Sequence, residues 1–190
     1  DRRQRQMCIR DRYHVPLLME AQGMIRFFEQ RLHLDLRRDV PSSRVSDGKE
    51  LRRRWKELTM SRERVFDTVE IVLVGKYTAL QDSYMSVTKA LEHASMQCQR
   101  RLVIKWVESG DLESHTEHED PVKYHQAWQH LCSSQGIIVP GGFGLRGTEG
   151  MILAVRWARE KNVPFLGICL GFQLAVVEFA RHVCGCLLYT

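Results

Sequence analysis

The sequence predicts an α/β fold, in which a parallel sheet carries helices on both faces and is preceded by a helical and linker segment. From residue 70 onward, short apolar runs typical of buried strands alternate with segments whose apolar residues recur at helical spacing. Two of the strand-like runs pass directly into glycine-rich stretches. In sheets of this kind, sites lie at the carboxyl ends of the strands. We therefore expect the functional site at one edge of the sheet.

The first 69 residues predict helices and a linker. Residues 13–33 are expected to form one helix, because their apolar residues share a face. Residues 34–50 contain Pro, Ser, Gly and mixed charge, which predict an exposed loop, and residues 49–66 again predict a helix. A single amphipathic helix cannot bury its apolar face alone, so we expect the chain to begin partway through a larger protein.

The remaining elements follow in strict alternation. The expected strands are 71–76, 102–107, 136–140 and 165–168. The expected helices are one capped by Asp82 and reaching Cys98, one opened by Pro121 and reaching Leu131, one over 147–161, and one from Leu170 to Val183. Residues 108–120 are expected to form an acidic loop.

Cys169 stands where the last strand turns into the last helix, within the sequence Gly-Ile-Cys-Leu-Gly-Phe-Gln at 167–173. Glycines two positions before and after it let the backbone turn sharply without a Cβ clash. This is the pattern of a nucleophile elbow with Cys in place of Ser. The following helix presents its positive end to the sulfur, which favours the thiolate. A Cys in an apolar stretch is more often a small buried hydrophobe. The prediction of a nucleophile therefore depends on the flanking glycines and on the position of Cys169 between a strand and a helix.

A second glycine-rich stretch, Pro-Gly-Gly-Phe-Gly at 140–144, follows the third expected strand. An acyl-transferring Cys needs amide N–H donors for the oxyanion that forms during attack. The N–H of Leu170 is one candidate, and the second must come from a neighbouring loop. A short glycine run is by itself as readily a plain turn, but both motifs at strand ends form a stronger signal.

Composition narrows the class of protein. The 190 residues are 44% hydrophobic and 27% charged, which is typical of a soluble globular domain with extra material. No apolar run is long enough to span a bilayer, and no secretory signal is visible. The six Cys are irregularly spaced, so we expect reduced thiols in a cytoplasmic protein without a membrane partner.

The net charge of +5 belongs to the front of the chain, because residues 65–190 carry eleven Lys/Arg against thirteen Asp/Glu. The run Arg52-Arg53-Arg54 beside Trp55 is the nearest approach to a nucleic-acid footprint. We interpret it as the solvated face of a linker helix, and expect no nucleic-acid partner.

The histidines of this sequence do not predict a metal site or a catalytic base. His115 and His118 lie among carboxylates in the acidic segment, where a metal site is conceivable, but we expect a solvated loop without a metal. The other four considered lie on expected helices and are interpreted as surface or interface residues: His93, His125, His130 and His182.

Residues 139–147 (Val-Pro-Gly-Gly-Phe-Gly-Leu-Arg-Gly) together with 167–173 resemble the class I, triad-type glutamine amidotransferases, whose sheet is flavodoxin-like. The similarity is closer still to the CTP synthase family. Motifs of its glutaminase domain occur in order at 74–77, 90–93, 119–125 and 157–159, and residues 13–18 and 22–23 resemble the end of its synthetase domain.

The resemblance implies a C–N-forming ligase that makes CTP from UTP, ATP and glutamine. Cys169 would attack the glutamine side-chain amide and form a glutamyl thioester, while Gly142 and Leu170 would form the oxyanion hole. Phe143 and Arg146 would contact the allosteric activator GTP. The implied glutamine-binding residues are Gly142, Leu170, Gly171, Phe172 and Gln173.

Cofactors and most partners are implied for the full-length enzyme. Mg²⁺ and ATP belong to a synthetase site that this chain lacks, so we expect this chain to bind no cofactor. Glutamine is the expected ligand here, UTP, ATP and GTP are those of the whole enzyme, and a homotetramer or filament is the expected assembly.

The sequence departs from the family in two places. Phe172 stands where family members usually have Met, and no His-Pro-Glu run supplies the base and carboxylate of a triad. We expect an internal fragment that is inactive alone and weakened by an open sheet edge. The expected parts are the synthetase end at 1–34, a linker at 35–69, a truncated amidotransferase domain at 70–184, and candidate non-native sequence at 1–12 and 185–190.

Two alternatives stay open. Another class I amidotransferase or a glutamyl hydrolase would carry the same two motifs but would not need the helix at 13–33 or the basic linker. A catalytically dead assembly or regulatory protein would have no reason to keep a reactive thiol, so labelling of Cys169 by a glutamine-analogue electrophile would distinguish it from an enzyme.

Overall fold

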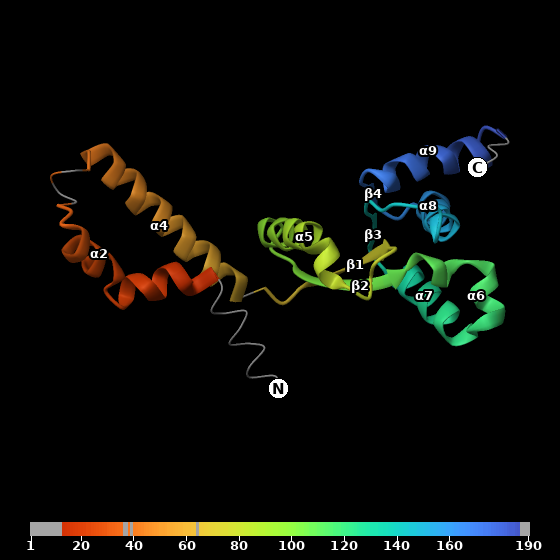
Figure 1. Cartoon of the computed structure of the whole chain (residues 1–190), viewed down its shortest axis with the longest axis horizontal. Coiled ribbons are helices and arrows are strands. Elements are labelled where there is room, and N and C mark those ends of the chain that lie inside the picture. The colour runs from red at the N-terminus through yellow and green to blue at the C-terminus, as the bar shows by residue number, and fades with distance from the viewer. Residues whose placement is uncertain (1–12, 36–37, 39, 64, 187–190) are drawn as a thin grey trace. The chain divides into compact units, whose positions relative to one another are not determined.

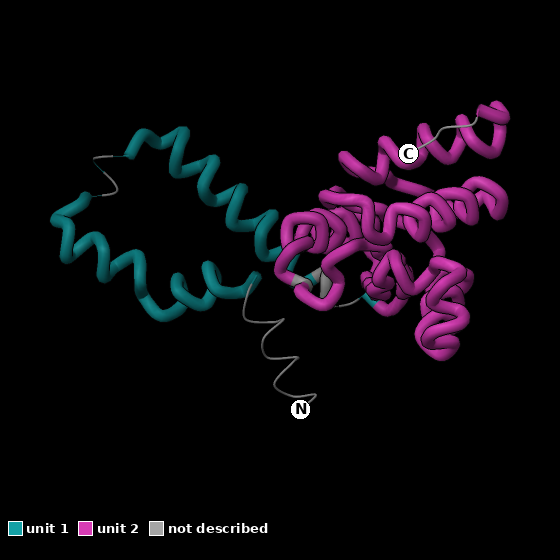
Figure 2. The backbone as a smooth tube through the Cα atoms, turned by 45° about the vertical axis from the view of Figure 1, so that its right-hand side comes forward, with its two compact units in different colours: residues 1–65 teal, residues 66–190 magenta. Residues whose placement is uncertain are grey.

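The computed structural model describes residues 13–35, 38, 40–63 and 65–186 of the 190. The predictions for residues 1–12, and for the 187–190 part of the tail, lie outside the described residues. The chain divides into two compact units, residues 1–65 and 66–190, coloured separately in Figure 2. None of the helices that the structure describes combines the length and apolarity needed to cross a membrane.

Unit 1 is helical, as the sequence predicts, but the bounds of its helices differ from the prediction. The single helix expected over 13–33 is wrong at Gly23, whose φ of 79° lies in the left-handed region and interrupts the helix. The loop expected over 34–50 is wrong from Ser42 onward, because a helix of 22 residues begins there. The helical segments are 13–21, α2 Met24–Leu32 and α4 Ser42–Glu63.

Ion pairs on α4 explain how so polar a segment is helical. Arg53 and Arg54 both hydrogen bond to Glu50, one turn earlier, and these contacts lower the pKa of the Glu50 carboxyl to about 2. Pairs at this spacing stabilise an exposed helix. Arg52 pairs with Glu20 of the 13–21 helix at 2.5 Å. The basic run therefore meets carboxylates of its own unit.

Unit 2 contains the sheet (Figure 1). Its elements are β1 Thr68–Gly75, η1 Gln81–Tyr84, α5 Met85–Gln97, β2 Arg101–Glu108, η2 Ser109–Leu112, α6 Ser114–Glu119, α7 Pro121–Ser133, β3 Gly136–Val139, α8 Thr148–Lys161, β4 Phe165–Gly167 and α9 Leu170–His182. All strand pairs are parallel, and the strand order is β2-β1-β3-β4. This is the flavodoxin-like order, so the predicted fold class is confirmed.

The sheet is covered on both faces, as the alternation along β1 shows. Val72 and Val74 pack on one face with side chains from α7, α8 and α9. Leu73 points to the opposite face, where it packs with Tyr84 and α5. Because neighbouring strand residues point to opposite faces, a strand buried along its length needs helices on both sides.

Two local expectations in unit 2 are wrong. Asp82 caps no helix, because residues 81–84 form a 3₁₀ turn and α5 begins at Met85. Tyr84 is pulled into the core, where its hydroxyl accepts a hydrogen bond from the Lys76 N–H at 3.0 Å. That packing sets the start of the helix.

The expected acidic loop at 108–120 is instead ordered into η2 and α6. Leu112 is completely buried, and the Thr116 hydroxyl donates to the Gly110 carbonyl at 2.8 Å, so the segment is tied to the core. The predicted start of α7 is confirmed, since the Asp120 side chain accepts from the Lys123 N–H and Pro121 occupies the first turn.

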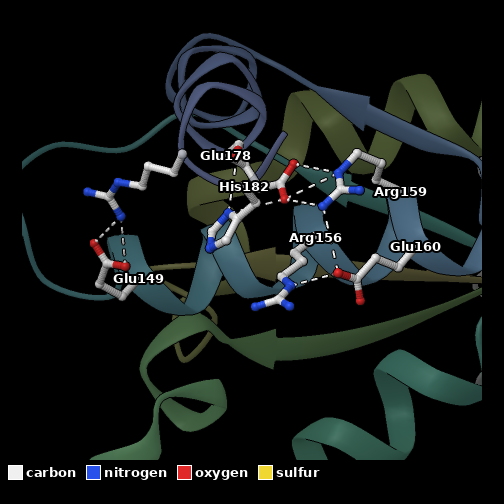
Figure 3. A network of polar contacts seen from close by, with 7 residues as sticks. Glu149, Arg156, Arg159, Glu160, Glu178 and His182 are labelled. Carbon is white, nitrogen blue, oxygen red and sulfur yellow. Dashed lines mark hydrogen bonds and ion pairs between the residues drawn. The ribbon is translucent and has the colours of Figure 1, made fainter. Parts of the chain in front are cut away.

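A buried ion pair joins α8 to α9 (Figure 3). The guanidinium of Arg159 donates three hydrogen bonds of 2.8–3.3 Å to the Glu178 carboxylate, which is 1% exposed. A buried carboxylate needs such partners, because leaving water is costly for a charge. The contact holds the α9 helix, whose first turn carries the site, against α8.

Candidate active site

Cys169 lies directly after β4 at the N-cap of α9. Its backbone has φ 54° and ψ −108°, a left-handed conformation that is strained for any residue other than glycine. Two hydrogen bonds hold the turn: the Ile168 N–H donates to the Val139 carbonyl at 2.9 Å, and the Gln173 N–H donates to the Cys169 carbonyl at 3.1 Å. The thiol side chain is exposed rather than packed in the core.

The two glycines around Cys169 are sterically required. A Cβ on Gly167 would lie 2.7 Å from the Gly171 carbonyl carbon, and one on Gly171 would lie 2.8 Å from the Val139 carbonyl carbon. Both distances are shorter than any ordinary carbon contact. The prediction that glycines two before and two after the Cys allow the turn is confirmed.

The glycine-rich 140–144 stretch approaches Cys169 from the end of the neighbouring strand, β3. It follows β3, which pairs with β4, so both segments leave the same edge of the sheet. A Cβ on Gly141 would lie 3.5 Å from the Cys169 Cβ and 3.8 Å from its Sγ. The structure therefore brings the two glycine-rich motifs together around one sulfur atom.

Two amide N–H groups are available next to the paired residues Cys169 and Gly141, because Leu170 follows the first in the chain and Gly142 follows the second. Among the described residues, the N–H groups of Gly142 and Leu170 donate no hydrogen bond to another group of the chain. The Leu170 N–H belongs to the first residue of α9, where helix N–H groups lack an intrahelical partner. Such fixed, unpaired donors are the groups that stabilise developing negative charge.

The remaining predicted site residues lie in the first turn of α9, next to Cys169, or on the 140–147 segment. Phe172 is 63% exposed, Gln173 is exposed, and Gly171 is buried against β3. Phe143 is 90% exposed. Arg146 is already engaged, because its guanidinium donates to the Lys76 carbonyl and to Glu108. The assigned roles of these residues stay predictions.

Among the described residues, no histidine forms a hydrogen bond or an ion pair with the Cys169 side chain. His182 contacts Glu178, with its Nδ1 3.1 Å from the carbonyl and 3.3 Å from the carboxylate oxygen, as a triad base would contact its acid. Yet His182 and Cys169 lie thirteen positions apart along one helix. At 1.5 Å per residue the separation is roughly 20 Å, so His182 does not reach the thiol.

Two further observations concern charged groups. The described residues include no group of three or more His, Cys, Asp or Glu arranged to hold a metal. Lys76 is buried, 2% exposed, at the end of β1. Burial and the charge of Arg146 lower the pKa of its ammonium, and Glu113 opposes this shift. Sequence reasoning missed Lys76, although a lysine directly after a buried apolar run was a usable signal.

Comparison with protein families places unit 2 in a known group. The family model described as glutamine amidotransferase class-I matches residues 79–185. This match covers α5 to α9, including both glycine-rich motifs.

Similar proteins extend the comparison upstream of that match. The chain is 53% identical to CTP synthase 1-A of Xenopus laevis over 185 residues and 52% identical to CTP synthase 1 of Saccharomyces cerevisiae over 173 residues. These alignments cover 96% and 91% of this chain but 30% of each relative. Among solved structures, the glutaminase domain of Trypanosoma brucei CTPS with bound acivicin matches with a TM-score of 0.53 and 42% identity. That match covers 62% of this chain and 42% of the other.

Proposed function

This chain belongs to the class-I glutamine amidotransferases, and from that premise we propose that Cys169 cleaves the side-chain amide of glutamine. The observation that carries the proposal is the strained, exposed Cys169 at the start of α9, with the glycine-rich 140–144 segment in contact with it. A nucleophile held at such a turn meets its substrate without first rearranging the backbone.

The covalent step follows from these groups. The Cys169 thiolate attacks the amide carbon of glutamine, and the carbonyl π electrons move onto oxygen. The N–H groups of Gly142 and Leu170 donate hydrogen bonds to that oxyanion. When the carbonyl re-forms, the C–N bond breaks, and the nitrogen takes up a proton and leaves as ammonia. A glutamyl thioester remains, and water hydrolyses it to glutamate and free thiol.

These steps also require a base that takes up and returns protons. His182 is too far from the sulfur, and the sequence contains no His-Pro-Glu run. The proposal for this chain therefore centres on the covalent step at Cys169, with Gly171, Phe172 and Gln173 binding the rest of the glutamine molecule.

The larger reaction is proposed from the relatives. The chain spans about 30% of the length of the CTP synthases it matches, and the similarity covers residues upstream of the amidotransferase segment. We propose that it is the ammonia-supplying part of a CTP synthase, in which ATP-dependent amination converts UTP to CTP. The upstream similarity favours this over another class I amidotransferase. GTP contact by Phe143 and Arg146, and assembly into a tetramer or filament, stay predictions.

The test of this proposal is selective labelling of Cys169 by acivicin. Acivicin is a glutamine analogue whose chloride is displaced by a thiolate, with formation of a C–S bond. We expect intact-mass and peptide mass spectrometry to show one adduct, at Cys169, that forms more slowly when excess L-glutamine is present. The Cys169→Ser chain should form none.

The chain offers its own controls. Cys98, Cys132, Cys184 and Cys186 are also exposed, so iodoacetamide should label them together with Cys169. Their reaction with acivicin should be slow and insensitive to glutamine. Equal acivicin labelling at all exposed thiols would contradict the proposal and favour a catalytically dead assembly or regulatory protein.

A further inference from the structure

A buried lysine lies between the ends of two neighbouring strands. Lys76 follows β1, and the 140–147 segment follows the adjacent strand β3. The Lys76 ammonium donates hydrogen bonds to the carbonyls of Gly144 and Phe143, the latter at 3.4 Å. A lysine is almost never fully buried without partners. Both hydrogen-bond acceptors of this ammonium belong to the segment that carries Gly142.

The aliphatic part of Lys76 contacts Gly142 directly. A Cβ on Gly142 would lie 3.2 Å from the Lys76 Cδ and 3.6 Å from its Cγ and Cε. The methylene groups therefore pass close to Gly142, while the ammonium reaches the carbonyls of the next two residues. One side chain thus restricts three successive residues of the segment.

A residue of the 140–147 segment also contacts the backbone of Lys76. The Arg146 guanidinium donates to the Lys76 carbonyl and pairs with Glu108 at 3.0 Å. The Lys76 N–H is itself held by the Tyr84 hydroxyl. The 140–147 segment is consequently bound to the end of β1 at both of its halves, although its three central glycine positions would otherwise leave the backbone free.

We propose that Lys76 is a positioning residue that holds the Gly142 N–H in the direction needed to stabilise the oxyanion formed at Cys169. This inference rests on the proposed glutamine-cleaving function. Donors that are fixed before the reaction stabilise developing charge without reorganisation. A shift of about 1 Å in such a group can cost roughly 100-fold in rate.

The test compares Lys76→Met with the unsubstituted chain. Methionine keeps the apolar stem but removes the ammonium donors. We expect amide hydrogen exchange to become at least about tenfold faster in residues 141–147, where glycine-rich backbone is released. Exchange in β1 and β3 should change little, because their ladder bonds do not involve the Lys76 side chain.

The second readout is a ratio of two labelling rates at Cys169. Attack on acivicin places negative charge on the ring atom beside the reacting carbon, so it needs the amide donors. Displacement of iodide from iodoacetamide at a saturated carbon does not. We expect the acivicin-to-iodoacetamide ratio to fall about 10- to 100-fold in Lys76→Met. A purely structural loss would lower both rates or neither.

Lys105→Met is the matched control. Lys105 is a partly buried lysine on β2 of the same sheet, and it pairs with Glu70 at 2.7 Å. Its replacement should leave the labelling ratio unchanged. If Lys76→Met does not fold, Arg146→Met removes the return contact from an exposed side chain, and it should lower the same ratio less strongly.

Each outcome separates the two proposals. An unchanged ratio in the folded variant overturns the positioning role of Lys76, whether or not the 141–147 exchange rises. Failure of the unsubstituted chain to react selectively with acivicin overturns the proposed function, and the Lys76 inference with it.

Discussion

Gly171→Ala should destabilise unit 2 by about 3 kcal/mol or more. The new Cβ would meet the Val139 carbonyl oxygen at well under contact distance and the carbonyl carbon at 2.8 Å. Alanine normally favours a helix over glycine by about 1 kcal/mol. Here the clash outweighs that gain, because both the helix start and the buried strand β3 are backbone that does not readily move.

Urea unfolding monitored by tryptophan fluorescence measures this effect, since Trp106, Trp128 and Trp157 all lie in unit 2. The matched control is Gly110→Ala, because a Cβ there has nothing within 4 Å. The control should stay within about 0.5 kcal/mol of the parent chain. Gly171→Ala should also lose acivicin labelling of Cys169. A variant as stable and as reactive as the parent would show that α9 does not pack on β3 in this way.

Arg159→Met should lower the melting temperature of unit 2 by roughly 5–10 °C. It leaves Glu178, which is 1% exposed, without the guanidinium that now donates to both of its oxygens. The loss should exceed that of Glu178→Gln, because Arg159 is one-third exposed and can turn toward water. Differential scanning calorimetry of the parent chain, Arg159→Met and Glu178→Gln measures the order of their melting temperatures.

A double variant makes this prediction sharper. Replacing both partners with methionine removes the buried charge along with its partner, and such replacements are often neutral or stabilising. We expect Arg159→Met/Glu178→Met to melt above Arg159→Met alone. Glu149→Gln breaks the exposed Arg181–Glu149 pair between the same helices and should have little effect. If the double variant instead lost as much stability as the two single methionine variants together, Arg159 and Glu178 would not be energetically coupled.

Much of unit 2 could be predicted because its signals are local. The strands from 71 to 168 appear as apolar runs. The pattern agrees best with burial in the two central strands, β1 and β3, whereas the edge strands β2 and β4 are only partly buried. The Cys169 turn was predictable because only glycine tolerates the approach that positions 167 and 171 make. In the same way, the start of α7 was predictable from an N-cap residue, Asp120, followed by a proline in the first turn, Pro121.

In unit 2, the errors occur where distant contacts outweigh local propensity. The 108–120 segment is polar and reads as a loop, but Leu112 and Thr116 pack into the core and order it. In unit 1, residues 42–50 contain Ser, Asp and Gly, yet α4 runs through them, and the ion pairs that support this exposed helix are local ones. Asp82 is a good capping residue, but the packing of Tyr84 decides where α5 begins.

By itself, the sequence determined the α/β alternation, the sharp turn at Cys169 and the glycine-rich stretch at 140–144, because each depends on neighbouring residues and on backbone sterics. Only the tertiary structure decided what surrounds them. Parallel pairing of β3 with β4 brings Gly141 to the sulfur, and parallel pairing of β1 with β3 lays Lys76 along Gly142. These contacts join residues from 28 to 66 positions apart in the chain, and no local pattern encodes such a distance.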